Sequence, residues 1–189
     1  MKKIRMIAGV STNGVIGIYD DSTSTHKLPW KYSEDMKFFK AMTTEDPDPT
    51  VVMGRITFES MGSKPLPKRK NIVVSSKEIQ HPDVLTCRTL QEAIDKGTTN
   101  TWLIGGASIY KEGMNYCESI HLGIIPEVIE GNNLIMFPFI NPADFTVINK
   151  RYEVCSNKKI YTMINMFKFL YTEEYLAEKA NLSKSLFVK

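Results

Sequence analysis

The stretches VVMGRIT (51–57) and WLIGGAS (102–108) decide the fold, because each runs from apolar residues into glycine and then into a helical pattern. A strand–glycine–helix junction presents free backbone N–H groups and the positive end of a helix dipole, which suit phosphate. Glycine also lets a ligand approach the backbone closely. Neither stretch is a GxGxxG or Walker A motif, and one alone is more typical of a tight turn. Two in one chain, with Arg55 directly after the first, favour a dinucleotide ligand.

Short apolar segments alternate with helical patterns along the chain. Strands are expected at 4–10, 50–54, 71–76, 83–87, 101–106 and 119–125, with a closing hairpin at 145–154 and 159–170. Ser33 and Thr89 are expected to cap two of the helices, and the others follow Gly54 and Gly106. This alternation predicts an α/β fold with a largely parallel sheet covered on both faces and an antiparallel edge.

Two polar segments lie outside this pattern. Residues 19–27 are expected to form a loop, and residues 172–184 an exposed helix capped by Thr172. The expected organisation is therefore one domain over residues 1–170, followed by a partly helical tail over residues 171–189.

The totals are those of an ordinary globular protein. A chain of 189 residues is long enough for one domain with a sizeable core. Hydrophobic residues make up 42% and charged residues 24%, and the net charge of +3 gives no reason to expect nucleic-acid binding. No segment approaches the roughly 20 apolar residues of a membrane span, and the N-terminal apolar run is too short for a signal peptide.

The cysteines and histidines indicate neither a disulfide framework nor a metal site. Cys87, Cys117 and Cys155 are odd in number and contain no CxxC pair, and reduced thiols suit a cytoplasmic location. The three histidines are far apart in the sequence and form no pattern of metal ligands.

Basic residues follow the expected strands near their carboxyl ends. Ser76 and Lys77 come at the end of the third strand, and Arg88 follows the fourth. Ligands of doubly wound sheets bind beyond the carboxyl ends of the strands. We therefore expect Arg55, Ser76, Lys77 and Arg88 to converge on one phosphate, although each alone is typical of a solvated surface.

The stretch LPWKYSEDMKFFK (28–40) raises a separate question about Asp35. An acid in the first helical turn complements the helix dipole, so a helix-end role is the simplest interpretation. Asp35 shares a face with Phe39, four residues on, but Glu34 has the same relation to Phe38. Periodicity therefore leaves open which acid faces the interior and whether it binds a ligand.

Six segments, taken in order, resemble the dihydrofolate reductase family over residues 4–170. They are IAGVSTNGVIG (7–17), LPW (28–30) with Asp35 and Phe39, VVMGRITFESMG (51–62), PLPKRKNIVVSS (65–76), WLIGGASIY (102–110) and FP (137–138). Each segment is a weak signal, whereas the ordered set is highly specific. The resemblance implies a three-layer α/β fold with a central eight-stranded, mostly parallel sheet and an antiparallel C-terminal hairpin strand. It also implies NADPH-dependent reduction of 7,8-dihydrofolate to tetrahydrofolate by a monomer that binds antifolate inhibitors.

The resemblance implies that Asp35 is the single acid of the pterin pocket, hydrogen-bonded to the 2-amino group and N3 of the pteridine. Arg69 would pair with the α-carboxylate of the glutamate tail, which suits its forked guanidinium, and Lys40 would flank that tail. Leu28 and Trp30 would close over the ligand beside Asp35 at the catalytic centre. The other folate-site residues implied are Ile7, Ala8, Met36, Phe39, Ser60, Met61, Leu66, Ile104 and Tyr110.

For the cofactor, basic residues at positions 55 and 88 favour NADPH over NADH, because the 2′-phosphate needs cationic partners. The glycine pair 105–106 matches a cis peptide of the family, and no metal is implied. The NADPH-contacting positions implied by the resemblance are Gly9, Ile16, Gly17, Gly54, Arg55, Ile56, Thr57, Ser75, Ser76, Lys77, Arg88, Ile104, Gly105, Gly106, Ala107, Ser108 and Ile109.

The implied mechanism is hydride transfer from nicotinamide C4 to pterin C6, with a proton added at N5 from water. The protein would contribute positioning and a preorganised electrostatic site. Burial is expected to raise the pKa of Asp35, partly opposed by the helix N-terminus. The loop 17–29 would act as a lid that excludes water.

Two departures from the family pattern affect this interpretation. Gly123 stands where the family usually has a threonine bonded to the acid, so a water or another residue must serve Asp35. The segment Gly131–Asn132–Asn133 replaces the usual Gly-Asp-Thr, which leaves its contacts with the lid open.

Two alternatives stay open. A related pyrimidine reductase of riboflavin synthesis would share the sheet and the NADPH site, but it is not expected to combine LPW, Asp35 and Arg69. A pterin- or nucleotide-binding protein without catalysis is the other, and Gly123 is the feature that supports it. A wholly structural role would leave the glycine junctions and the acid unexplained.

Overall fold

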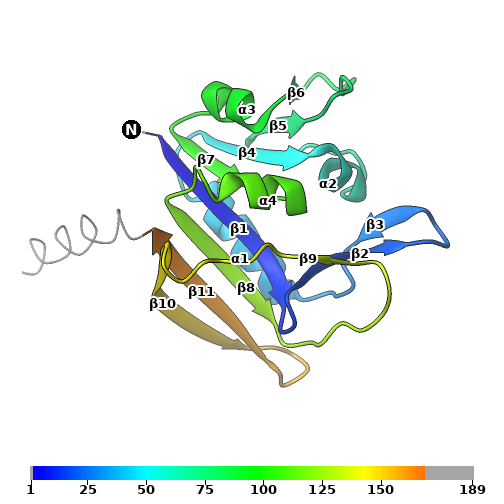
Figure 1. Ribbon diagram of the computed structural model, residues 1–189, viewed down its shortest axis with the longest axis vertical. Helices are drawn as coiled ribbons and strands as arrows, with labels where there is room; N and C mark the ends of the chain where they lie inside the picture. Colours follow the sequence, from blue (N-terminus) through cyan, green and yellow to red (C-terminus); the bar gives the residue numbers. More distant parts are fainter. Residues whose placement is uncertain (1, 169–189) are drawn as a thin grey trace, which may run out of the picture.

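The computed structural model describes residues 2–168, and its centre is an eight-stranded sheet (Figure 1). The strand order is β10-β11-β8-β1-β7-β4-β5-β6. Neighbours from β8 to β6 run parallel, while β11 and β10 are antiparallel to theirs. This arrangement confirms the predicted fold class. The strands are β1 (Lys3–Ser11), β4 (Pro49–Gly54), β5 (Lys70–Val74), β6 (Val84–Cys87), β7 (Asn100–Leu103), β8 (Ser119–Ile125), β10 (Phe145–Val154) and β11 (Ile160–Lys168).

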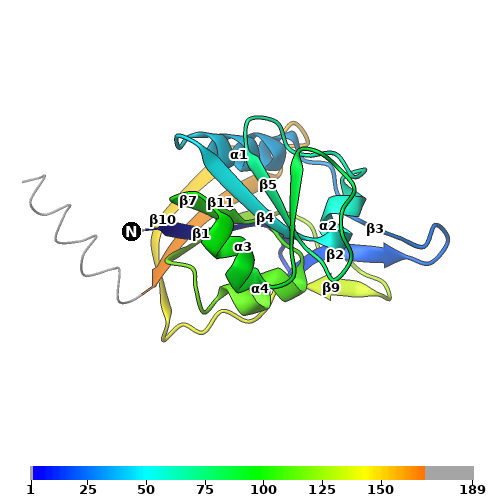
Figure 2. The same cartoon turned by 90° about the horizontal axis from the view of Figure 1, so that it is seen from above.

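Helices cover both faces of the sheet: α1 lies on one face, and α3 and α4 lie on the other (Figure 2). The helices are α1 (Ser33–Thr44), α2 (Arg55–Ser60), α3 (Leu90–Lys96) and α4 (Ala107–Gly113). The predicted cap at Thr89 is confirmed, because its side chain accepts a hydrogen bond from the Glu92 N–H at 3.1 Å. The predicted cap at Ser33 is wrong: Ser33 is already helical, and the extended residue before it, Tyr32, makes no side-chain cap.

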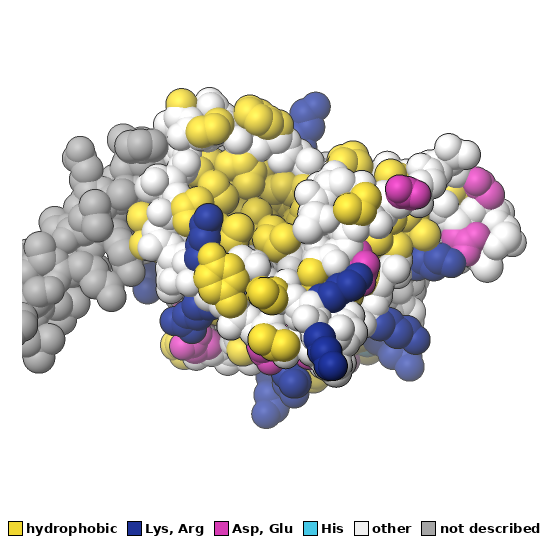
Figure 3. Space-filling view, turned by 90° about the horizontal axis from the view of Figure 1, so that it is seen from below, with side chains coloured by type: hydrophobic (Ala, Val, Ile, Leu, Met, Phe, Trp, Pro, Cys, Tyr) yellow, Lys and Arg dark blue, Asp and Glu magenta, His cyan; other side chains and the backbone are white. Residues whose placement is uncertain are grey.

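The predicted loop at 19–27 is also wrong, because this segment forms most of a β-hairpin. Strands β2 (Val15–Asp20) and β3 (Thr25–Lys27) pair antiparallel, and β9 (Leu134–Met136) adds to β2 to make a second sheet. Cross-strand pairs hold the hairpin: the rings of Tyr19 and His26 lie 5.0 Å apart, and Lys27 bridges Asp20. The hairpin projects from the body of the molecule with acidic side chains near its tip, beside a face where hydrophobic side chains line a hollow (Figure 3).

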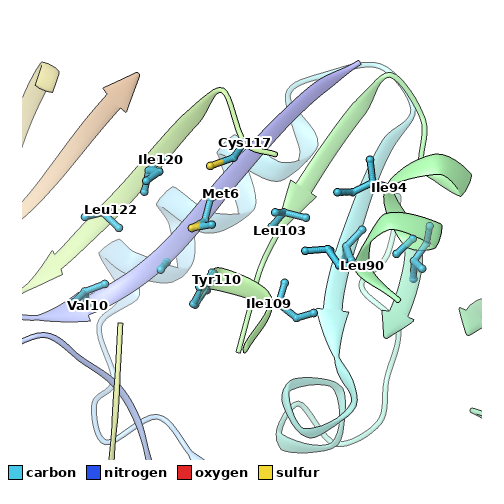
Figure 4. Close-up of a cluster of buried hydrophobic side chains, with 14 of the residues drawn as sticks. Met6, Val10, Leu90, Ile94, Leu103, Ile109, Tyr110, Cys117, Ile120 and Leu122 are labelled. Atoms are coloured by element: carbon cyan, nitrogen blue, oxygen red, sulfur yellow. The ribbon is translucent and has the colours of Figure 1, made fainter. Parts of the chain in front are cut away.

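The hydrophobic core is divided by the sheet into two main clusters. Met6 of β1 packs with Leu103, Ile120 and Tyr110 on the α3–α4 face (Figure 4). The next residue of β1, Ile7, packs in the cluster on the α1 face, because successive side chains of a strand point to opposite faces. A strand that is covered on both faces reads as a continuous apolar run, which is why β1 could be identified from the sequence.

Further predictions concern the C-terminal tail, the cysteines and membrane spans. The helix predicted at 172–184, like the whole tail at 171–189, lies outside the described residues. Cys87, Cys117 and Cys155 are free and buried. Within residues 2–168, no helix is both long enough and apolar enough to cross a membrane.

Truncating Leu103 tests the core on the α3–α4 face. Leu103 is completely buried, so Leu103→Ala is expected to lower the free energy of unfolding by about 2–5 kcal/mol, measured by chemical denaturation. Val128→Ala is the matched control, because Val128 is 64% exposed and an exposed truncation changes stability by only about 0.5 kcal/mol. Equal effects of the two variants would contradict the assignment of Leu103 to the core.

Candidate functional site

The Asp35 carboxylate lies buried against the backbone of the central sheet. It stands in the first turn of α1, above Gly9 of β1 and Gly123 of β8, which are direct partners in the parallel register. A Cβ on Gly9 would lie 2.8 Å from Asp35 Oδ2, closer than side chains allow. The seat of the carboxylate is therefore made by two adjacent glycines. Glu34 is also buried, but its carboxyl faces Cys155: burial raises the pKa of that thiol, and the Glu34 charge adds to the shift.

The hydrogen-bond donor to Asp35 is a tyrosine that was not predicted from the sequence. The Tyr161 hydroxyl, from β11, donates a hydrogen bond to Asp35 Oδ1 at 2.9 Å. This answers what replaces the hydroxyl expected at position 123. The signal in the sequence was Gly123 itself, because a glycine inside a strand often marks a close approach of another group.

Burial dominates the electrostatics of Asp35. Desolvation raises the pKa of its carboxyl, as predicted, and the hydrogen bond from Tyr161 opposes that shift because it stabilises the charged form. The indole of Trp30 also lowers the Asp35 pKa. Trp30 Nε1 is buried, and within residues 2–168 no acceptor lies at both the distance and the angle of a hydrogen bond from it. Two side chains therefore oppose the effect of burial, and the predicted contribution of the helix N-terminus stays a prediction.

The residues predicted for the folate site fall into a buried wall and an exposed rim. Ile7, Ala8, Ile104 and Tyr110 are buried, and the Tyr110 hydroxyl donates to the Ile7 carbonyl at 2.9 Å. Phe39, Met61 and Leu66 are partly buried and pack against the cluster that contains Ile7 and Ile104. Leu28, Met36, Lys40 and Ser60 are exposed.

Arg69 is held in a fixed position near this rim. Its Nη1 donates to Thr43 Oγ1 at 2.7 Å, and its Nε donates to the Pro67 carbonyl at 3.1 Å. The guanidinium carbon lies 5.9 Å from the ring centroid of Phe39. Partial burial lowers the pKa of Arg69, but an arginine stays cationic in proteins. Arg69 therefore presents an anchored positive charge beside a predicted folate-site ring.

Several residues predicted for the cofactor lie at or just after the carboxyl ends of neighbouring parallel strands. Because β7, β4, β5 and β6 are consecutive neighbours and parallel, the residues that follow them form a row. The Gly105–Gly106 peptide is cis, as predicted, and the Gly54 N–H donates to the Gly105 carbonyl at 2.7 Å. A Cβ on Gly106 would lie 3.2 Å from Thr57 Oγ1. The two glycine junctions of the sequence are thus in direct contact, with Gly105 buried and Gly54 and Gly106 partly buried.

The predicted convergence of cations is partly seen. Arg88 Nη1 donates to the Ser76 carbonyl at 2.7 Å, which brings Arg88 beside Ser76 and Lys77. Arg55 instead forms an exposed ion pair with Glu59 one helical turn away. The Ser75 hydroxyl is used locally, because it donates to the Lys77 carbonyl at 2.6 Å.

The other predicted cofactor residues are distributed among neighbouring elements. Gly9 lies under Asp35 on β1, rather than in the row of strand ends. Ile56 and Thr57 belong to α2, Ala107, Ser108 and the buried Ile109 to α4, and Ile16 and Gly17 to β2.

The segment Gly131–Asn133 does contact the hairpin predicted as a lid. The Tyr19 N–H donates to the Asn133 carbonyl at 3.1 Å, and Asn133 Nδ2 donates to Asp21 Oδ2 at 2.6 Å. The altered sequence of this segment therefore keeps a connection to the hairpin between β2 and β3. Closure of that hairpin over a ligand stays a prediction.

The fold and the site define a class: an α/β protein with two glycine junctions on a row of parallel strand ends and a buried acid over the neighbouring strands. A family model for dihydrofolate reductase matches residues 3–169. The chain therefore belongs to the dihydrofolate reductase family.

Individual relatives agree with this assignment. The chain is 40% identical to the dihydrofolate reductase of Buchnera aphidicola from Acyrthosiphon pisum, over 68% of this chain and 76% of that protein. It is 30% identical to the Bacillus subtilis enzyme over 96% of this chain and 98% of the relative. A solved structure of the Enterococcus faecalis dihydrofolate reductase, in complex with NADP(H) and RAB-propyl, superposes with a TM-score of 0.76 at 30% identity, covering 88% of this chain and 96% of that one. These findings confirm the predicted family, reductase class and NADPH cofactor.

Replacing Asp35 by asparagine is expected to stabilise the ligand-free protein at neutral pH. A carboxyl whose pKa is raised on folding favours the folded state most below its ordinary value of 3.8 and loses that contribution as pH rises through the raised pKa. Above that window the wild type keeps a buried charge that Asp35→Asn lacks. We expect the melting temperature of the variant to be roughly 2–4 °C higher at pH 7, which corresponds to about 1 kcal/mol, and the gain to shrink toward pH 4. A lower melting temperature at pH 7 would contradict the desolvation argument.

Proposed function

We propose that Asp35 binds the pterin ring during the NADPH-dependent reduction of 7,8-dihydrofolate to tetrahydrofolate, the reaction of this family. The single observation that carries the proposal is the Asp35 carboxylate, buried on the paired glycines Gly9 and Gly123 beside the row of strand ends. A carboxylate with two oxygens matches two neighbouring N–H donors, which the pterin offers at its 2-amino group and N3.

The remaining residues of the site position and enclose the substrate. Ile7, Ile104 and Phe39 form an apolar wall for the ring, and Arg69 offers its fixed guanidinium to the α-carboxylate of the glutamate tail. Trp30 interacts with the acid, and Leu28 directly follows the hairpin that we propose as the lid. Exclusion of water strengthens the electrostatic interactions of the site.

The cofactor lies, in this proposal, along the strand ends of β7, β4, β5 and β6. NADPH supplies the hydride that is added to pterin C6, and the proton at N5 comes from water. The protein contributes the glycine junctions at Gly54 and Gly105–Gly106, which allow close approach of the cofactor, and the cations Arg55, Lys77 and Arg88. A cationic row of this kind favours the extra phosphate of NADPH over NADH.

The proposal also covers the oligomeric state, the location and the partners of the protein. The protein works as a monomer in the cytoplasm, where a reducing environment suits its three free, buried cysteines. Its partners are the small-molecule substrate and antifolates that occupy the same pocket.

Both alternatives are weakened. The family assignment does not favour the pyrimidine reductase of riboflavin synthesis. The non-catalytic binder rested on the missing hydroxyl at Gly123, and Tyr161 supplies a hydroxyl to the same carboxylate.

Asp35→Asn tests the role of the acid in turnover. The amide has lost the charge and one acceptor, so kcat/KM for dihydrofolate is expected to fall about 10²–10³-fold. Turnover is measured as the loss of absorbance at the NADPH band. NADPH binding, measured by quenching of protein fluorescence, should be unchanged. Glu34→Gln is the matched control, because it makes the same change at the neighbouring buried acid. Equal losses in both variants would contradict a specific role of Asp35, and a wild type that binds both ligands without turnover would support the non-catalytic alternative.

Arg88→Ala tests the cationic end of the cofactor site. Loss of a charge-assisted contact to the 2′-phosphate should raise KM for NADPH roughly 10-fold and leave KM for NADH almost unchanged. Lys96→Ala is the control, because Lys96 pairs with Glu92 on α3. If KM rises equally for both nucleotides, Arg88 does not recognise the 2′-phosphate.

A further inference from the structure

Tyr161 lies on β11, which is separated from β1 by β8, and its side chain reaches across β8 to Asp35. In the antiparallel register of β11 and β8, Met163 lies opposite Gly123. Tyr161 precedes Met163 by two residues, so both side chains point to the α1 face. Gly123 is therefore a diagonal neighbour of Tyr161, within reach of an aromatic side chain.

Gly123 leaves the space that the Tyr161 ring occupies. A Cβ on Gly123 would overlap the Tyr161 hydroxyl and would lie 2.8 Å from Tyr161 Cζ and 2.7 Å from Asp35 Oδ1. Glycine inside a strand weakens the strand, and the residues next to Gly123 are Leu122 and Ile124, good strand formers. The glycine is explained by the phenol that passes over it.

Packing fixes the Tyr161 ring in this position. Tyr161 is completely buried, and the Phe38 ring of α1 meets it edge-on, with centroids 6.4 Å apart. Phe38 lies one helical turn after Asp35. The same helix therefore supplies the acid and a wall for the ring that hydrogen-bonds it.

Asp35 is the group that titrates in this cluster. Burial and the Asp35 charge hold the pKa of Tyr161 far above its usual range, so the phenol stays protonated and donates at every working pH. Tyr110, from α4, is the other titratable neighbour, and the same two causes raise its pKa. Glu34 of α1 faces Cys155, and β1 and β8 contribute glycines at this point.

We propose that Tyr161 is a positioning residue for Asp35 and that Gly123 is the position its ring requires, so that the two residues work as one unit. Tyr161 acts through the carboxylate: its hydrogen bond holds Oδ1 in place and favours the ionised form over the protonated one. The importance of this unit for turnover rests on the proposed function, whereas its effect on Asp35 does not.

Tyr161→Phe removes the hydroxyl and keeps the ring. The Asp35 carboxyl is titrated by carbon-13 NMR in the ligand-free protein, with its signal assigned by loss in Asp35→Asn. We expect the Asp35 pKa to rise in Tyr161→Phe, the pKa reported by the pH profile of kcat/KM to move in the same direction, and kcat/KM at neutral pH to fall on the order of 10-fold. An unchanged Asp35 pKa would overturn the proposal.

A double exchange separates the hydroxyl from packing. Tyr161→Leu removes the ring from above position 123, and Gly123→Thr then returns a hydroxyl near Asp35 from β8. The Asp35 carboxylate must move away from the added Cβ, which would otherwise lie 2.7 Å from Oδ1, and the valine control requires the same movement. In the Tyr161→Leu background, Gly123→Thr should move the Asp35 pKa back toward the wild-type value and recover part of kcat/KM. Gly123→Val has the same shape without the hydroxyl, and it should do neither. If the threonine and valine variants titrate alike, the hydroxyl does not govern Asp35 and the proposal fails.

The two readouts distinguish this proposal from the proposed function. Absence of dihydrofolate turnover in the wild type would remove the function, while the NMR titration of Asp35 would still support or overturn the Tyr161–Gly123 unit. Normal turnover in the wild type with an Asp35 pKa that does not respond to Tyr161→Phe would overturn the unit and leave the function intact.

Discussion

A single buried carboxylate sets the requirements that the surrounding structure meets. A buried carboxylate has two needs. The first is a hydrogen bond that replaces hydration, because removing the Asp35 charge from water is otherwise costly. The second is a backbone surface without side chains, which the carboxylate can approach closely. The register of β1 and β8 meets the second need by pairing Gly9 with Gly123. Tyr161 meets the first by donating to Oδ1. The acid is therefore fixed by the sheet rather than by the helix that carries it.

The sheet order joins this acid to the cofactor residues. β1 supplies part of the Asp35 seat and is also the neighbour of β7, the first strand of the row that ends at Arg88. Tyr110 connects the strand under the acid to the glycine junction. Its hydroxyl donates to the Ile7 carbonyl, and a Cβ on Gly105 would lie 3.0 Å from the Tyr110 hydroxyl oxygen. A shift of the glycine junction would thus reach Ile7, in the wall of the proposed pterin pocket, through one side chain. Hydride transfer depends on such fixed relative positions.

The sequence predicted the parts that local pattern controls. Buried parallel strands read as apolar runs, so β1, β4, β5 and β7 were found, and the cap at Thr89 followed from residue chemistry. The hairpin of β2 and β3 was missed because its exposed strands carry polar residues such as Asp20 and Lys27, which resemble a loop. Tyr161 could not be placed, because pairing of β11 with β8 is a long-range choice that no local pattern records. Gly123 was noticed only as a loss, although an interior glycine also indicates that another group approaches closely.

The exchange at Gly123 shows how a departure from a family pattern should be weighed. What a buried acid requires is a donor at hydrogen-bond distance, and the physical requirement does not specify the strand from which that donor comes. A hydroxyl on β8 and a phenol on β11 meet it equally in principle, but they exclude each other, because a Cβ at position 123 would overlap the phenol. The glycine at position 123 and the tyrosine at position 161 are therefore structurally coupled, because the glycine leaves the space that the phenol fills. Taken alone, Gly123 argues against catalysis, and Tyr161 is one more buried core residue. Taken together, they leave Asp35 with a hydrogen-bond donor.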